Sequence, residues 1–504
     1  MIGRAGFREV VRSRAAASEA WARVASLISG ALPLLAFPRP GLAWFAWVAL
    51  VPGLVLMRSA PTVRTAAFRG WWFGTGYLLA ALYWMVPSIG PGLLLVAVVF
   101  GALWAGWGAA ARWLSPAAAV AVLPCVWVAI EFVRYWPRLG GPWALLGATQ
   151  WKHPMVLSLA AVGGVWLISL VLVAANTALA LALLSPRRRV VPLGVALALI
   201  GVGPLTYALR PAPPAGSTFR VALVQPGVLP NRAVRLTEGE RITAGLPPVD
   251  LVVWGESSVG YDVVRDRDVA SRLDALATRN GPLLVNEDAR DASGRISKSA
   301  ILLRSDGSRE RYVKTRLVPF GEYIPFRSAF GWLTRISKAA GEDRVPGTGV
   351  QVMQAGDITF GPLICFESTF PDYGRAVVHK GAQMLVYQSS TSTFQDSWAP
   401  AQHASLVAVR AAETGRPAVQ AALTGVTAAF DAQGRRLTWM DTGERGAAVV
   451  TLTSPPRDFR TPYDRFGDYV AYLAVVASGV TLLIAARRLR RRSPRPQATR
   501  DGNA

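Results

Sequence analysis

The chain has little cysteine, lysine or histidine. Only two cysteines, Cys125 and Cys365, occur among 504 residues, so a framework of several disulfide bonds is excluded. Only five of the 54 basic residues are lysines, and a reaction that needs a compact ammonium group must use one of them. The three histidines, His153, His379 and His403, lack the spacing of metal ligands, so we expect no metal site and no cofactor.

Acidic side chains are nearly missing from residues 1–210, which hold three glutamates and no aspartate. Apolar residues make up 52% of the chain, and the mean hydropathy is +0.31. Both values are higher than those of a typical soluble domain. Since a membrane span needs roughly 20 apolar residues, we expect a transmembrane α-helical bundle of about eight spans. The expected spans are 24–37, 42–57, 68–87, 92–111, 116–134, 155–184, 190–209 and 469–486.

The formal net charge of +23 could indicate a nucleic-acid partner, but the placement of the arginines favours a membrane. They cluster before the first expected span, in alternate connectors, and after the last span. The positive-inside rule therefore predicts a protein of the cytoplasmic membrane, with both termini cytoplasmic and no nucleic-acid partner. No cleavage site for a signal peptidase follows the first apolar segment, which we interpret as an anchor. The expected regions are a bundle of about seven spans at 1–210, an extracytoplasmic domain at 211–467, the last span at 468–487 and a basic cytoplasmic tail at 488–504.

Short β-branched runs alternate with helical patterns between residues 211 and 467. This alternation predicts an α/β layered domain. We expect strands at 219–225, 251–254, 283–286, 299–303, 312–314, 360–366, 384–388, 418–423 and 447–452, and helices at 266–279, 370–380 and 400–414.

Three segments of this domain each place a reactive side chain at or just after the end of an expected strand. Glu256 follows 251–254, Lys314 ends 312–314, and Cys365 lies near the end of 360–366. A carboxylate can remove a thiol proton, the thiolate can attack a carbonyl carbon, and an ammonium group can stabilise the resulting oxyanion. The three residues therefore predict acyl-transfer chemistry with Cys365 as the nucleophile.

At these residues the chain resembles the carbon–nitrogen hydrolase (nitrilase) superfamily. With its expected spans included, it resembles the apolipoprotein N-acyltransferase family. The most specific segment is 314–325, which reads KTRLVPFGEYIP. The resemblance implies an α-β-β-α sandwich and a triad of Glu256 as base, Lys314 and the nucleophile Cys365. It also implies supporting roles for Glu322, Glu367 and Phe366, although either of these two glutamates could instead orient Lys314 or form a structural ion pair.

The resemblance further implies a two-step reaction. Cys365 takes an acyl chain from a phospholipid as a thioester, and the α-amino group of a diacylglyceryl-cysteine on an apolipoprotein then accepts it. The expected partners are thus a phospholipid, an apolipoprotein and the bilayer, and we expect a monomer. Two alternatives remain at this point: a membrane-tethered amidase that uses water or another amine, and a non-catalytic lipoprotein-binding scaffold.

Several positions depart from the pattern of these families. Gly255 stands where a proline is usual before the glutamate, and Phe366 stands where a tyrosine is common after the cysteine. The segment 389–394 replaces a polar and aromatic loop, and the loop after Gln225 and Pro226 lacks a tryptophan.

The connector 136–153 is aromatic and basic, typical either of an interfacial belt or of a wall of a lipid site. On the second interpretation Trp143 and Trp151 would bind substrate, and we expect the same of Tyr323. Glu131 and Arg134, near the outer end of an expected span, would either act on the substrate or pair with each other. We expect Cys125 only to pack within the membrane.

Overall fold

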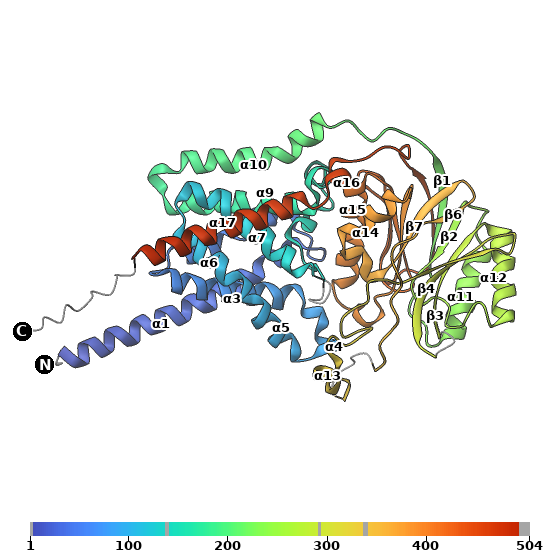
Figure 1. The fold of residues 1–504 in the computed structure, drawn as a ribbon, viewed down its shortest axis with the longest axis horizontal. Helices are drawn as coiled ribbons and strands as arrows, with labels where there is room; N and C mark the ends of the chain where they lie inside the picture. The colour runs from blue at the N-terminus through green and yellow to red at the C-terminus, as the bar shows by residue number, and fades with distance from the viewer. Residues whose placement is uncertain (1–3, 137–140, 291–293, 336–340, 493–504) are drawn as a thin grey trace, which may run out of the picture.

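The computed structural model describes residues 4–136, 141–290, 294–335 and 341–492. The amino-terminal helices and the last helix lie together at one end of the molecule, and a two-sheet domain lies at the other (Figure 1). The carboxyl-terminal helix therefore returns to the bundle that the first helices form.

The bundle contains nine long or medium helices among the described residues. They are α1 (Arg4–Ala31), α2 (Val51–Arg58), α3 (Val63–Ala81), α5 (Gly92–Gly101), α6 (Leu103–Trp113), α7 (Pro116–Arg134), α9 (Ala160–Leu184), α10 (Val190–Leu209) and α17 (Tyr469–Arg492). Five segments are long and apolar enough to cross a membrane: Gly92–Trp113, Pro116–Arg134, Ala160–Leu184, Val190–Leu209 and Tyr469–Arg488. They coincide with five of the eight expected spans.

The other three expected spans are also helical, but their helices are too short or not apolar enough to be counted with these five. The first begins within α1 and continues into the 3₁₀ turn η1 (Leu32–Ala36), which contains Pro33. The second is the short apolar segment Ala43–Arg58, made of η2 (Ala43–Trp47) and α2. The third is α3, which carries Arg64 and Arg69. The total of eight crossings remains a prediction.

Helix α9 is the most buried of the five apolar segments, with 72% of its apolar window inside the protein. Its first turn is broken at Gly163 and Gly164, and Gly164 has a φ of 69°. A Cβ atom at Gly164 would lie 2.5 Å from the ring of Tyr463. Glycine is therefore required here, because the backbone is left-handed and an aromatic ring packs directly against it.

The domain after residue 217 is an α-β-β-α sandwich, as the resemblance implies. One sheet has the order β12-β1-β2-β3-β4-β5 and the other the order β11-β10-β9-β8-β7-β6. The strands are β1 (Thr218–Gln225), β2 (Leu251–Trp254), β3 (Leu283–Arg290), β4 (Ile296–Leu303), β5 (Arg309–Val313), β6 (Met353–Ala355), β7 (Ile358–Ile364), β8 (Met384–Ser389), β9 (Ala418–Ala422), β10 (Thr427–Phe430), β11 (Arg436–Met440) and β12 (Gly446–Thr453).

A dry core separates the two sheets and includes Leu223, Val253, Phe360 and Val386, all fully buried. Helices α11 (Arg232–Ala244) and α12 (Arg267–Asn280) cover the first sheet on the side away from the bundle (Figure 1). Helices α14 (Pro371–His379) and α15 (Ala399–Thr414) cover the second sheet. The expected strands are all present, but β6, β10, β11 and α11 were not expected from the sequence.

The second helical layer lies between its sheet and the bundle (Figure 1), so every residue of α15 is buried. Within this interface the amide of Val165, beside the break in α9, donates to Glu413 Oε1 at 2.9 Å. Glu413 also pairs with Arg410, whose Nε lies 3.0 Å from Glu413 Oε2. A buried hydrogen bond thus joins α15 to α9, and the ion pair within α15 holds the accepting glutamate in place.

Candidate active site

Cys365 begins the 3₁₀ turn η8 (Cys365–Thr369) that directly follows β7. Its φ is 47°, in the left-handed region that a residue with a side chain rarely adopts. Such strain is typical of functional positions, because the surrounding structure must hold it. The residue as a whole is partly exposed.

Two buried glutamates face Lys314. The Lys314 Nζ atom lies 2.9 Å from Glu322 Oε1 and 3.3 Å from Glu256 Oε1. The second oxygen of Glu322 accepts a hydrogen bond from the amide of Val318 at 2.9 Å, so this carboxylate is fixed on both sides. The Cys365 thiol lies close enough to the Glu256 carboxylate for that carboxylate to raise the pKa of the thiol. The structure therefore brings Glu256, Lys314, Glu322 and Cys365 together, as expected.

The two sheets meet at this point through backbone hydrogen bonds. The amide of Glu256, after β2, donates to the carbonyl of Ser389 in β8 at 3.1 Å. Gly255 allows this approach, because a Cβ atom there would lie 1.9 Å from the amide nitrogen of Leu423. Glu256, which follows a strand of one sheet, is thereby held against the sheet that carries Cys365.

A second lysine, Lys298, also contacts Glu256, and it was not among the residues expected from the sequence. Lys298 Nζ lies 3.0 Å from Glu256 Oε1, and it donates to Ser257 Oγ at 2.8 Å. Asp288 Oδ1 lies 3.5 Å from the same ammonium group. No local motif marks Lys298; only the register of β3 and β4, which pairs Asp288 with Lys298, shows its place.

These contacts determine the resting protonation state. Burial and the neighbouring Glu256 carboxylate raise the pKa of the Cys365 thiol to about 12. Burial would also raise the pKa of Glu256, but the ammonium groups of Lys298 and Lys314 outweigh it and lower that pKa to about 2. Burial disfavours the charge of Lys314, yet Glu322 and Glu256 raise its pKa. The resting site thus holds a thiol, a carboxylate and an ammonium group.

Glu367 has a different surrounding from the other glutamates. One oxygen accepts from the Tyr312 hydroxyl at 2.8 Å and from the amides of Thr315 and Arg316, and the other accepts from the amide of Ile364 at 2.7 Å. Among the described residues it forms no ion pair, and it contacts neither Lys314 nor Glu256. Glu367 therefore ties the segment after Lys314 to the strand end that precedes Cys365.

The residue after the nucleophile reaches the bundle. The Phe366 ring stacks on Trp143, with centroids 6.4 Å apart, and Trp143 also contacts Trp84 and His403. In the replaced segment, Phe394 packs on the same Trp84 ring at 4.8 Å. Aromatic side chains from both halves of the molecule thus surround the nucleophile turn on its bundle side.

Glu131 and Arg134 hold the loop that carries Trp143. Glu131 Oε1 accepts from the amide of Leu146 at 2.8 Å, and Arg134 donates to the carbonyl of Trp143 at 2.5 Å. Both side chains are buried, and no ion pair joins them within the described chain. Of the two roles left open for these residues, pairing with each other is not what the described structure shows.

Trp151 and Tyr323 lie differently from Trp143. Trp151 is buried and stacks on Trp439 with centroids 5.1 Å apart, so its ring fills the contact with β10 and β11. Tyr323 directly follows Glu322 and is half-buried, and its carbonyl accepts from the amide of Phe320 at 2.6 Å. Their assignment to substrate binding remains a prediction.

The remaining candidates have local roles. Cys125 donates to the carbonyl of Ala121 within α7. The ring of His403 bonds to Gln420, Ser368 and Ser389. Over the described residues, no group of three His, Cys, Asp or Glu side chains is placed to hold a metal ion. Pro137, Arg138 and Gly140, which belong to the aromatic and basic connector, lie outside the described residues.

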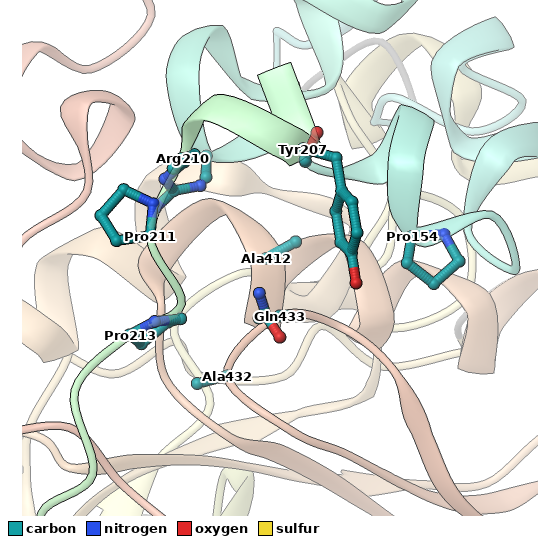
Figure 2. Close-up of a pocket in the computed structure, with 10 residues that line it drawn as sticks. Pro154, Tyr207, Arg210, Pro211, Pro213, Ala412, Ala432 and Gln433 are labelled. Atoms are coloured by element: carbon teal, nitrogen blue, oxygen red, sulfur yellow. The ribbon is translucent and has the colours of Figure 1, made fainter. Parts of the chain in front are cut away.

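A separate pocket lies where the end of α10 meets the linker and the domain (Figure 2). Its labelled lining includes Pro154, Tyr207, Arg210 and Gln433, with the Tyr207 ring and the Gln433 amide directed into it. None of the lining residues belongs to the cluster around Cys365. This pocket is therefore not part of the candidate active site.

Comparison with known proteins matches both halves of the chain. Residues 29–178 match the apolipoprotein N-acyltransferase N-terminal domain, and residues 220–456 match the carbon-nitrogen hydrolase domain. An apolipoprotein N-acyltransferase of Geobacter metallireducens is 30% identical over 92% of this chain and 95% of its own. Those of Pseudomonas putida and Azotobacter vinelandii are also 30% identical, over 87% and 94% of this chain and 92% and 96% of their own. The chain belongs to the apolipoprotein N-acyltransferase family.

Among solved structures, an amidase from Nesterenkonia sp. aligns with 22% identity and a TM-score of 0.37, over 50% of this chain and 97% of the amidase. Membership in the apolipoprotein N-acyltransferase family confirms the resemblance seen in the sequence. It identifies the chain as an acyltransferase and a membrane protein. It also favours acyl transfer over a membrane-tethered amidase or a non-catalytic scaffold.

Proposed function

We propose that the chain moves an acyl chain from a phospholipid to the α-amino group of a diacylglyceryl-cysteine on an apolipoprotein, through a thioester on Cys365. One observation carries this proposal. Cys365, a partly exposed residue, lies beside the buried Glu256 and Lys314 pair, and the next residue, Phe366, packs on the bundle. A nucleophile at this junction can meet an ester that remains in the bilayer.

In the first step, the Cys365 sulfur attacks the carbonyl carbon of the phospholipid ester while its proton moves to Glu256. Lys314 stabilises the negative oxygen of the tetrahedral intermediate. The carbon–oxygen bond of the ester then breaks, and the proton on Glu256 passes to the departing oxygen. The products are a thioester on Cys365 and a lysophospholipid, and Glu256 is again a carboxylate.

In the second step, the α-amino nitrogen attacks the thioester carbonyl carbon. An α-amino group has a pKa of about 7.7–8.0, so a useful fraction is unprotonated near neutral pH. Glu256 takes a proton from the attacking nitrogen and returns it to the departing Cys365 sulfur. An amide forms, the carbon–sulfur bond breaks, and the resting thiol is restored.

Three carboxylates support this chemistry in different ways. Glu256 acts as the base, and Glu322 holds Lys314 in place from the opposite side at 2.9 Å. Glu367 holds the backbone on both sides of the site through hydrogen bonds alone. Within the bundle, Trp143 forms the wall that faces the nucleophile turn.

The proposal includes an orientation in the cytoplasmic membrane. The arginine-rich connectors support cytoplasmic termini by the positive-inside rule, with the domain 211–467 outside the cytoplasm, between the bundle 1–210 and the span 468–487. The tail 488–504 then remains cytoplasmic. Both substrates would approach from the outer leaflet, and one copy of the chain carries every residue of the proposed site.

The proposal is tested by incubating the purified full-length protein in detergent with a phospholipid labelled in its acyl chains and a diacylated lipopeptide. We expect labelled N-acyl lipopeptide and lysophospholipid, with no product from Cys365→Ala and normal product from Cys125→Ala. Release of labelled fatty acid without acylated lipopeptide would instead indicate a hydrolase.

A further inference from the structure

Glu256 Oε1 lies between two ammonium groups. Lys314 approaches it from the segment after β5 at 3.3 Å, and Lys298 approaches it from β4 at 3.0 Å. The side chains of both lysines are almost fully buried, at 1% and 7% exposure. Burying an ammonium group is costly without a partner of opposite charge, so the position of Lys298 needs an explanation.

The partners of Lys298 distinguish it from Lys314. Ser257 Oγ accepts from Lys298 at 2.8 Å and donates to Asp288 Oδ2 at 2.7 Å. Asp288 in turn is paired with Arg344. Lys298 therefore shares Asp288 with an arginine, and its closest carboxylate oxygen belongs to Glu256.

Several other groups face Glu256 from the surrounding elements. Cys365 lies at the end of β7 and Glu322 lies behind Lys314. His403 lies on α15, and burial lowers its pKa, so this ring is neutral. The cations near the base are thus Lys298 and Lys314, with Arg344 farther out beyond Asp288.

We propose that Lys298 is a positioning residue of this enzyme: it keeps Glu256 ionised and fixes its Oε1 atom beside Lys314. Lys298 contacts the base and not the thiol, so it acts through Glu256. The effect of Lys298 on the charge of Glu256 does not depend on the identity of the substrates. The role of Lys298 in acyl transfer rests on the proposed function.

The consequence for the reaction concerns the proton that Cys365 gives up. With two ammonium groups beside it, a protonated Glu256 is a strong acid and releases its proton readily. In the first step that proton passes to the oxygen of the departing lysophospholipid. Lys298 thus disfavours proton transfer to the base in the resting site and favours proton transfer to the leaving group.

The first test reads the base directly in the unmodified full-length protein. Infrared spectra of the wild-type protein and of Glu256→Gln are recorded across pH, and their difference isolates the protonated carboxyl band of Glu256. We expect this band to stay absent down to about pH 4, below the ordinary glutamate pKa of about 4.3. A band that titrates at or above that ordinary value would overturn the proposal.

The second test changes Lys298 itself. The spectrum of Lys298→Met is compared with that of the double variant Lys298→Met and Glu256→Gln, and their difference again isolates the Glu256 band. We expect this band to titrate at least about one pH unit higher than in the wild type. Lys298→Arg keeps the charge and is expected to follow the wild type, as is Lys380→Met, a change at an exposed lysine outside the site. A folded Lys298→Met protein that titrates like the wild type would contradict the inference.

The two tests separate this inference from the proposed function. The infrared band reports the protonation of Glu256 whether or not the protein acylates a lipopeptide. If Lys298→Met does not fold, as thermal unfolding would show, a wild-type band that titrates at or above the ordinary glutamate value still overturns the proposal, and the comparison of Lys298→Arg with the wild type tests the need for a charge at this position. If acyl transfer fails while the band behaves as expected, only the substrate assignment is wrong.

Discussion

The ring of Phe366 stacks on the ring of Trp143, with centroids 6.4 Å apart and planes inclined by 27°. Phe366 directly follows the nucleophile, whereas Trp143 belongs to a loop of the membrane bundle. This contact joins the turn that carries Cys365 to a loop of the helical bundle. On the proposed function, the bundle would therefore form one wall of the active site.

The contact predicts that the two tryptophans of the connector differ in effect. We expect Trp143→Ala to lower the rate of thioester formation from a phospholipid about tenfold or more, since aromatic packing positions the nucleophile turn. Trp151→Ala removes a buried ring that stacks on Trp439, so we expect it mainly to destabilise the fold, by about 3–5 kcal/mol. Thioester formation and thermal unfolding of both variants distinguish the two effects. Equal losses of rate in folded proteins would contradict this division.

Glu322 is expected to matter through Lys314. In Glu322→Gln the ammonium group loses its closest carboxylate, which lies 2.9 Å away, and is held less firmly beside the oxyanion. We predict a fall in the rate of thioester formation of about 10²-fold or more, the size seen when an oxyanion donor is disturbed. The matched control is Glu310→Gln, which removes a carboxylate that pairs with Arg304 away from the site. A rate within twofold of wild type would rule out this role.

Glu367 is expected to act on the fold. A glutamine at this position can accept hydrogen bonds with its carbonyl oxygen but not with its amide nitrogen. Either the amide of Ile364, or the donors of Tyr312, Thr315 and Arg316, therefore lose their acceptor. Leaving such buried donors unsatisfied costs about 1–3 kcal/mol. We predict a lower unfolding temperature for Glu367→Gln together with reduced activity. Reduced activity with unchanged stability would indicate a direct role in the chemistry instead.

The reactivity of the resting thiol gives a pH-dependent prediction. Since burial and Glu256 raise the pKa of Cys365 to about 12, alkylation by iodoacetamide is expected to be slow near neutral pH and to rise throughout the alkaline range. Glu256→Gln removes the negative charge that disfavours the thiolate. Its alkylation should therefore be faster at every pH and its midpoint lower, measured in a Cys125→Ala background. A midpoint that rises in Glu256→Gln would show that the carboxylate does not raise the thiol pKa.

The sequence pattern was sufficient for an α/β layered domain and for bringing Glu256, Lys314 and Cys365 together, whereas the two-sheet sandwich came from the family resemblance. Each of the three lies at or next to a strand end, and strand ends of one sandwich edge converge. Lys298 was missed because its approach to Glu256 depends on the register of β3 and β4 and on a neighbouring strand, which no local pattern encodes. The rarity of lysine, with only five in the chain, was the one sequence signal that could have drawn attention to Lys298.

The contacts between the bundle and the domain were also beyond the sequence. The connector around Trp143 could have been an interfacial belt, since aromatic and basic residues suit both roles. Its approach to Phe366 depends on how α9 and α15 pack, including the break at Gly164 that frees the amide of Val165 for Glu413. Such long-range packing decides which aromatic residues surround the site.

The most direct test of the account is the mass of the full-length protein after incubation with a phospholipid in the absence of an acceptor. The account predicts an increase by one acyl group, located on Cys365, present in Cys125→Ala and absent in Cys365→Ala. Addition of a diacylated lipopeptide should remove the increase and yield an N-acylated peptide. An unmodified protein that still acylates the lipopeptide, or an adduct that persists in Cys365→Ala, would contradict the thioester mechanism.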